Sequence, residues 1–199
     1  MKQRYSTYEA EKTTLLDFIT DRPGHYVIEI GAFQGATTVR LADAVSRVGK
    51  HLIAIDPWNG YYSADEEIYR SFLHNIAPWN DHVTVLRTTS QDAVLPSVVL
   101  ENAALVFVDG DHAGEAPYND MVKFWPYVAI GGVLAVHDYF DRLLGTNVSA
   151  AVDRFVRNLP PPQNLFLLRV YPTDWERRRH RSTRADNIAG LAWIVKDAI

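Results

Sequence analysis

The sequence contains no cysteine. Disulfides, zinc–thiolate sites and thiol nucleophiles are therefore excluded, and the composition suits a reducing compartment. Basic residues are not in excess either, because 20 Lys and Arg face 24 Asp and Glu for a formal net charge of −4. A chain without an overall positive field is poorly suited to a phosphate backbone. We therefore expect a small-molecule ligand rather than a nucleic acid.

The sequence also lacks any apolar run of the length that a membrane helix needs, and its first residues, MKQRY, are charged rather than apolar. We expect no membrane contact and a cytoplasmic protein. A chain of 199 residues with 47% hydrophobic residues is long enough to bury one core and short for two. We expect a leading helical segment, residues 1–24, followed by one domain, residues 25–199.

Apolar residues at helical spacing, Leu15, Leu16 and Ile19, lie among charges in residues 8–20. Pro23 and Gly24 follow this stretch and end it. The pattern predicts an amphipathic leading helix that covers either one side of a sheet or the functional site.

Continuous apolar segments alternate with amphipathic ones from residue 26 onward. The pattern predicts strands at residues 26–30, 51–55, 83–87, 104–108 and 132–136, and helices at residues 36–47, 65–77, 118–127 and 145–158. Such alternation is typical of a buried parallel sheet with helices on both faces. Two last strands, residues 165–171 and 191–196, follow without a helix between them. We expect an α/β fold whose seven-stranded, mostly parallel sheet closes with an antiparallel last strand.

The first strand ends in an acid and a glycine-rich turn, with Glu29 in the strand and Gly31 and Gly35 after it. A dinucleotide site would instead carry G-x-G-x-x-G, and its absence disfavours an NAD-binding oxidoreductase. The acid inside the strand end favours a ligand that carries an amine and a sulfonium over one that carries phosphates. Asp56 ends the next strand, where an acid can accept hydrogen bonds from both hydroxyls of a ribose.

Four further segments complete a family pattern: DPW at residues 56–58, TSQD at 89–92, VDGDH at 108–112 and GGVLAVHDY at 131–139. With the turn after the first strand, they resemble class I S-adenosylmethionine (SAM)-dependent O-methyltransferases over residues 26–139. The combination of DGDH with GGVxxxHDY is similar to the macrocin O-methyltransferase type and, more distantly, to catechol O-methyltransferase. The resemblance implies a Rossmann-like class I methyltransferase fold.

The resemblance also implies a SAM site. The methionine part would contact the strand end and turn, the ribose would contact the acid after the second strand, and the adenine would lie against the SQ pair. The residues implied are Glu29, Gly31, Ala32, Gln34, Gly35, Asp56, Trp58, Ser90, Gln91 and Asp109. For Trp58, stacking on adenine, shaping the pocket mouth and a buried packing role are all open.

In metal-dependent relatives, the positions of Asp109, His137 and Asp138 hold magnesium, which lowers the pKa of the acceptor hydroxyl. His137 departs from the family, because a carboxylate often stands there and imidazole is a poor magnesium ligand. Three arrangements are open: the two aspartates hold magnesium, His137 recruits a transition metal such as manganese or iron, or no metal binds.

His112 follows Asp109 by three positions, where the catechol enzymes carry a catalytic lysine. The catalytic candidates are His112, Asp109 and His137. Either histidine could be the general base, because an imidazole titrates near neutral pH. A hydrogen-bond network that only fixes the loops is the structural alternative.

Aromatic residues after the second and fifth strands are candidate walls of an acceptor pocket: Trp58, Tyr61, Tyr62, Tyr69, Tyr139 and Phe140. The arginine-rich residues 175–187 form either a solvated loop or a clamp for an anionic substrate.

We predict methyl transfer from SAM to a hydroxyl of a sugar or aromatic natural product, assisted by Mg²⁺ or Mn²⁺. A metal-independent enzyme that acts on oxygen or nitrogen, and a catalytically silent SAM-binding partner protein, are the alternatives. The leading helix makes a homodimer plausible.

Overall fold

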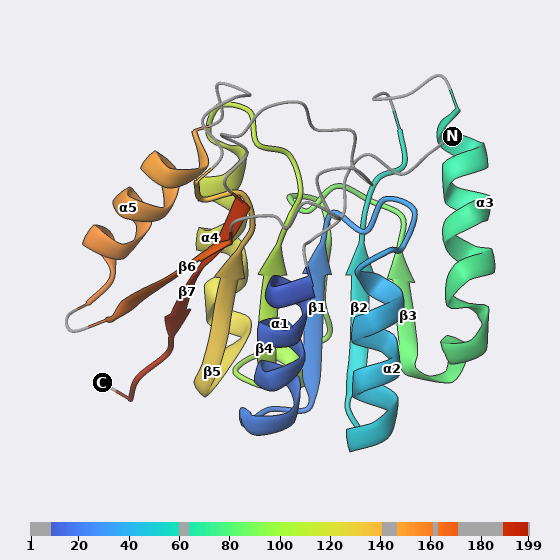
Figure 1. Cartoon of the computed structure of the whole chain (residues 1–199), viewed down its shortest axis with the longest axis horizontal. Helices are drawn as coiled ribbons and strands as arrows, with labels where there is room; N and C mark the ends of the chain where they lie inside the picture. The colour runs from blue at the N-terminus through green and yellow to red at the C-terminus, as the bar shows by residue number, and fades with distance from the viewer. Residues whose placement is uncertain (1–8, 60–63, 141–146, 161–162, 171–188, 199) are drawn as a thin grey trace.

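The computed structural model describes residues 9–59, 64–140, 147–160, 163–170 and 189–198. Within these residues seven strands form one sheet in the order β3-β2-β1-β4-β5-β7-β6 (Figure 1). The strands are β1 (Tyr26–Ile30), β2 (His51–Ile55), β3 (Val83–Leu86), β4 (Ala103–Val108), β5 (Val128–Val136), β6 (Leu165–Val170) and β7 (Ala189–Val195). Strands β1 to β5 pair in parallel, and β7 is antiparallel to both β5 and β6. The predicted sheet is confirmed.

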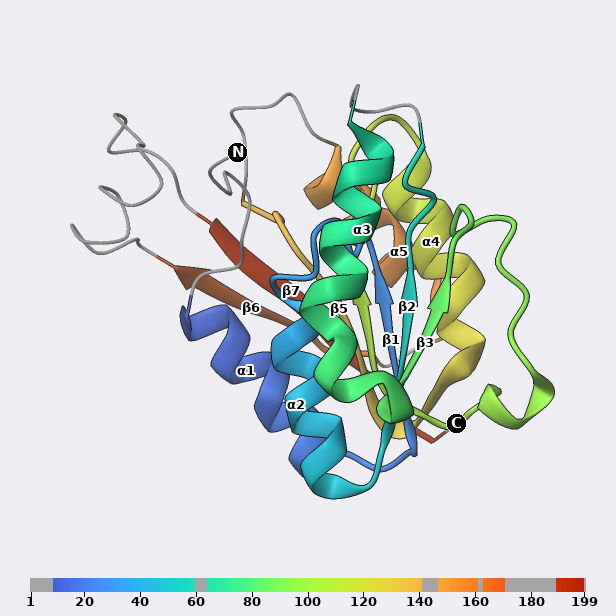
Figure 2. The ribbon, with the colours of Figure 1, turned by 90° about the vertical axis from the view of Figure 1, so that its right-hand side faces the viewer.

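Helices cover both faces of the sheet, as predicted (Figures 1 and 2). The α-helices of the described residues are α1 (Glu9–Asp21), α2 (Thr38–Val48), α3 (Asp65–Ile76), α4 (Ala116–Phe124) and α5 (Val148–Asn158). Buried residues of α1, α2 and α3 share one hydrophobic cluster with one face of the sheet, and those of α4 and α5 share a second cluster with the other face. No helix in the described part of the chain is long and apolar enough to cross a membrane.

The leading helix α1 packs on the sheet beside α2. Its stripe of buried residues, Glu11, Leu15, Phe18 and Ile19, follows the i, i+4, i+7, i+8 spacing of one helix face. The three apolar members belong to the same cluster as Phe107 of β4. Of the two predicted roles for this helix, covering the sheet is therefore confirmed.

The largest difference from the predicted elements lies in β5, which begins at Val128 rather than at Gly132. The pairing of β4 with β5 is irregular between Ala103 and Leu105, because their partners are Val128 and Val133. A Cβ on Gly132 would lie 2.6 Å from the carbonyl oxygen of Ala103. This bulge interrupts the apolar run, so the sequence pattern identifies only the second half of the strand.

Helix ends also differ from the predictions. Helix α4 ends at Phe124, and Trp125–Tyr127 forms a 3-10 turn that contains Pro126. A proline lacks the N–H that a continuing α-helix requires, which explains the early end. Helix α5 begins at Val148, three positions later than predicted, and residues 141–146 lie outside the described part of the chain.

Candidate active site

The candidate site lies at the carboxyl ends of β1, β2, β4 and β5, which meet at one edge because these strands are parallel. Gly31 brings the ends of β1 and β4 together. Its φ is 91°, and a Cβ there would lie 2.1 Å from the carbonyl oxygen of Asp109. Only glycine allows this approach and this φ at once. The turn after β1 therefore packs directly against the first acid of the DGDH segment.

Glu29 is a buried acid at the end of β1. Its side chain is 1% exposed, and its Oε2 has no hydrogen-bond partner among the described residues. Burial raises the pKa of Glu29 to about 8, the contact with Thr38 opposes this, and the charges of Asp109 and Asp56 add to it. A buried carboxyl group near two other acids is stabilised by a cation, so this position fits the amine of a bound ligand.

Asp56 follows β2 and lies beside the turn after β1. Its Oδ2 accepts a hydrogen bond from the N–H of Phe33 at 2.9 Å, and its Oδ1 accepts one from the N–H of Trp58 at 2.8 Å. Burial raises the pKa of Asp56, whereas these two hydrogen bonds lower it. Asp56 thus ties together the two loops that would surround a nucleoside, and each oxygen has a second lone pair for a ligand hydroxyl.

The Trp58 side chain is 4% exposed and packs into the core. Its ring centroid lies 4.8 Å from that of Tyr69 and 4.7 Å from that of Phe72, and its indole N–H donates to the carbonyl of Phe33 at 2.7 Å. The φ of Trp58 is 45°, a value that few residues other than glycine adopt. This placement corresponds to the packing role among the three that the sequence allowed.

Ser90 and Gln91 lie on the side of the site next to α4. Both donate hydrogen bonds to Oδ1 of Asp120, at 2.5 Å and 2.8 Å, and Lys123 donates to the main-chain carbonyl of Gln91. Asp120 is 2% exposed, and burial raises its pKa against the effect of these bonds. The sequence analysis missed Asp120. An acid beside Met121 on the buried face of a helix is the signal that could have identified it.

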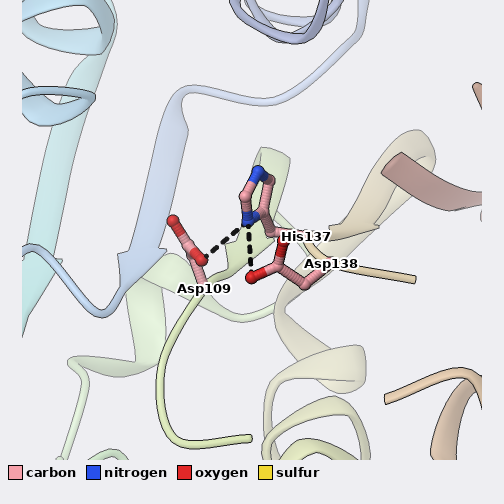
Figure 3. Close-up of side chains that lie close together, drawn as sticks. All are labelled: Asp109, His137 and Asp138. Atoms are coloured by element: carbon pink, nitrogen blue, oxygen red, sulfur yellow. Dashed lines mark ion pairs between the residues drawn. The ribbon is translucent and has the colours of Figure 1, made fainter. Parts of the chain in front are cut away.

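Three residues predicted as metal ligands lie together at the ends of β4 and β5 (Figure 3). His137 Nδ1 lies 3.1 Å from Asp109 Oδ1 and 3.2 Å from Asp138 Oδ2. Asp138 has a φ of 58°, in the left-handed region that aspartate tolerates better than most residues. The sequence prediction that these three side chains converge is confirmed.

The electrostatics of this cluster are dominated by its acids. Burial lowers the pKa of His137, but the charges of Asp109, Asp138 and Glu11 together raise it well above its usual 6.5. Burial likewise raises the pKa of Asp138, and the charge of His137 lowers it below its usual value. The neighbouring acids therefore favour the protonated form of the His137 imidazole.

His112 stands on the outer side of the same cluster. Its Nδ1 lies 3.6 Å from Asp138 Oδ2, its Nε2 lies 3.9 Å from Asp109 Oδ1, and its side chain is 23% exposed. The DGDH segment thus brings its histidine to the site, as predicted. The side chain of His112 is more exposed than that of His137, which is 10% exposed, but its Nε2 atom is buried and has no hydrogen-bond partner among the described residues.

Glu11 is a second residue that the sequence analysis missed. It projects from α1, is fully buried, and places its Oε2 3.3 Å from His137 Nε2. Its signal in the sequence is a single acid on the apolar stripe of the leading helix, four positions before Leu15. Helical spacing identifies the apolar face of the helix, but it does not indicate which group an acid on that face contacts.

The donor set of Asp109, His137 and Asp138 fits a divalent cation. Metal–ligand bonds of about 2.1 Å place neighbouring ligands of an octahedral ion about 3 Å apart. The distances of 3.1 Å and 3.2 Å from His137 Nδ1 to the two carboxylates match this spacing. Two carboxylates with one imidazole suit manganese or iron better than magnesium, which prefers oxygen ligands only.

The aromatic residues expected around an acceptor pocket have other contacts. The Tyr69 ring packs on Trp58, and the Tyr139 hydroxyl donates to Asp153 of α5 at 2.8 Å. The Phe140 ring lies edge-on to Tyr139, with the Arg169 guanidinium 4.6 Å from its centroid. Tyr61, Tyr62 and the arginine-rich residues 175–187 lie outside the described residues.

The strand order, the antiparallel β7 and the site at the carboxyl edge of the sheet define the class I methyltransferase fold. The family described as "Methyltransferase domain" matches residues 28–139, more than half of the chain. The protein belongs to this family of methyltransferases, which confirms the resemblance seen in the sequence.

Solved structures share the fold at low sequence identity. A SAM-dependent O-methyltransferase of Thermotoga maritima is 18% identical with a TM-score of 0.64, over 100% of this chain and 69% of that one. The O-methyltransferase TomG of Streptomyces achromogenes, involved in tomaymycin synthesis and solved with SAM, is 16% identical with a TM-score of 0.68, over 97% and 82%. An uncharacterised protein of Acanthamoeba polyphaga mimivirus is 27% identical over 157 residues, 74% of this chain and 68% of that protein.

Proposed function

We propose that the protein is a SAM-dependent O-methyltransferase that methylates a hydroxyl of a small metabolite, such as a sugar or an aromatic natural product, with the help of a divalent metal. The observation that carries the proposal is the convergence of Asp109, His137 and Asp138 directly beside the Gly31 turn. This convergence supports a metal site next to the expected cofactor site. Structural relatives crystallised as O-methyltransferases, one of them with SAM, support it.

The cofactor site is supported by two acids with different surroundings. The buried Oε2 of Glu29 has no hydrogen-bond partner in the described part of the chain and suits a cationic group such as the amine of SAM. Asp56 is held by two main-chain N–H groups and presents its remaining lone pairs to a ribose. Ser90 and Gln91, held by Asp120, border the position proposed for the adenine.

Asp109, His137 and Asp138 would hold the metal. When bound, a divalent cation lowers the pKa of an acceptor hydroxyl and fixes its orientation. The imidazole in this set favours Mn²⁺ over Mg²⁺.

During transfer, the acceptor oxygen forms the new C–O bond while the S–CH₃ bond of the sulfonium breaks, and the hydroxyl proton must leave to a base. We assign this proton to His112. Its side chain is more exposed than that of His137, and its Nε2 and Nδ1 face Asp109 and Asp138 at 3.9 Å and 3.6 Å. His137 is the weaker candidate for the base, because its Nδ1 would hold the metal and the charges of its acidic neighbours raise its pKa.

A metal-independent methyltransferase is the second candidate function, and one observation favours it. The same His112 has carboxylate partners that could support it as a base without a metal.

The cytoplasmic location, the exclusion of nucleic acid and a homodimer stay predictions.

The proposal is tested with EDTA-treated protein and methyl-labelled SAM. The acceptors would be catechols, simple phenols and sugars with neighbouring hydroxyls, each without metal and with Mg²⁺ or Mn²⁺. We expect label transfer to a hydroxyl that requires metal and is fastest with Mn²⁺. Transfer that is unaffected by EDTA would support the metal-independent candidate, and SAM binding without transfer to any acceptor would support a silent binding protein.

A further inference from the structure

The feature that the proposed mechanism leaves unused is the buried acid of α1. Glu11 is 0% exposed and shares its helix stripe with Leu15, Phe18 and Ile19. A carboxylate inside an apolar cluster is costly unless it is paired. The burial of Glu11 is therefore explained by the polar group that its carboxylate contacts.

Glu11 contacts the side of His137 that faces away from the candidate metal ligands. Its Oε2 lies 3.3 Å from His137 Nε2, whereas Asp109 and Asp138 face Nδ1 (Figure 3). The ring of Phe107 stands edge-on to the imidazole, with the centroids 6.2 Å apart. Phe107 of β4 and Glu11 of α1 thus fix the orientation of the His137 ring, and neither belongs to the set of candidate metal ligands.

We propose that Glu11 is a positioning residue for the active site, which accepts the Nε2–H of His137 and so keeps Nδ1 directed toward Asp109 and Asp138. The inference rests on the proposed metal-assisted function. A histidine that ligates a metal through one ring nitrogen typically donates the other N–H to a carboxylate, which fixes its tautomer and ring orientation. In this chain the carboxylate comes from the leading helix, 126 positions away.

The consequence is that α1 belongs to the catalytic apparatus as well as to the core. Loss of such a partner typically lowers metal affinity by about 10- to 100-fold. The residue is expected to act on the metal site through His137 and to leave the SAM site unchanged.

The test compares two substitutions of Glu11. Glu11→Leu keeps an apolar stripe and removes the acceptor, whereas Glu11→Gln keeps an acceptor oxygen and removes the charge. Glu9→Gln is the matched control, because Glu9 is on the same helix, is exposed, and pairs with Lys12 and Arg40 instead. Mn²⁺ affinity is measured by calorimetry at one fixed pH. The His137 ring is observed by ¹⁵N NMR in metal-free and Mg²⁺-containing protein, with assignment from a His137→Gln sample.

We expect a slowly exchanging Nε2–H signal of His137 in the wild type, in Glu9→Gln and in Glu11→Gln. Glu11→Leu should lose this signal and bind Mn²⁺ about 10- to 100-fold more weakly. A folded Glu11→Leu variant with the wild-type signal and affinity would overturn the proposal. So would an unprotonated Nε2 in the wild type, which decides the matter even where Glu11→Leu does not fold. Absence of Mn²⁺ binding by the wild type would count against the metal-assisted function, while the metal-free spectra would still test Glu11.

Discussion

The two halves of the site both contain acidic side chains, but their pKa values are shifted in opposite directions. At the ends of β1 and β2, Glu29 is buried and Asp56 is half-buried, neither pairs with a histidine or lysine of the described residues, and burial raises the pKa of both. At the ends of β4 and β5, Asp138 lies beside His137 and His112, and its pKa is lowered. Within the described residues, the first half therefore lacks a cation that a ligand could supply, whereas the second half contains two histidines. In the proposed mechanism, the first half binds the cofactor and the second half carries the chemistry.

The largest effect is expected in the chemical half. Asp138→Asn should lower turnover about 10³-fold, because it removes one carboxylate from both the candidate metal site and His112. Affinity for S-adenosylhomocysteine, measured by calorimetry, should stay near the wild-type value. Asparagine tolerates the φ of 58°, so this variant avoids the backbone strain that Asp138→Ala adds. An Asp138→Asn enzyme with normal turnover would exclude Asp138 from the chemistry.

The next effect concerns stability in the binding half. Between pH 4.5 and about 8, folded Glu29 retains a proton that the unfolded chain has lost. The free energy of unfolding should therefore fall as the pH rises through this window. The decrease is complete above about pH 8. Glu29→Gln should remove roughly 4 kcal/mol of this pH dependence between pH 5 and pH 9. Urea unfolding at pH 5 and pH 9 measures it, with exposed Glu67→Gln as control. Equal pH dependence in wild type and Glu29→Gln would show that Glu29 ionises normally.

His112→Gln tests which histidine accepts the proton. Turnover should fall about 10²-fold, the lower end of the range for loss of a general base, with cofactor affinity unchanged. His74→Gln, at an exposed histidine of α3, is the control and should be fully active. Undiminished turnover of His112→Gln would move the base role to another group.

The smallest expected effect is that of Asp56→Asn on the cofactor. An amide cannot accept both main-chain N–H bonds and a ribose hydroxyl with full strength, so affinity for S-adenosylhomocysteine should fall about 10-fold. Because the substitution also weakens these two main-chain hydrogen bonds, the free energy of unfolding should fall by about 1 to 3 kcal/mol. Unchanged affinity, with exposed Asp81→Asn as reference, would remove Asp56 from the cofactor site.

Much of the fold and the chemical half of the site followed from the sequence, for a physical reason. Residues that directly follow strands of a parallel sheet must meet at one edge, so strand ends alone bring Asp109, His137 and Asp138 together. Continuous apolar runs locate those strands with little ambiguity.

The residues that escaped prediction depend on contacts between distant elements. Glu11 meets His137 only because α1 packs over β4, and Asp120 meets Ser90 only because α4 faces the loop after β3. Periodicity describes the exposed and buried faces of a helix, and it does not indicate which polar group a buried acid faces. The bulge in β5 escaped for a similar reason, because the close approach of Gly132 to Ala103 is a property of the paired strands.

The most direct test of the two-part site is a calorimetric titration of EDTA-treated protein with S-adenosylhomocysteine, followed by Mn²⁺ and then, in a separate run, Mg²⁺. We predict one cofactor site, and then one Mn²⁺ site of higher affinity than Mg²⁺ in the complex. Cofactor binding without any metal heat would contradict the metal-assisted chemistry and leave His112 as a base without a metal. Absence of cofactor binding would contradict the proposed function as a whole.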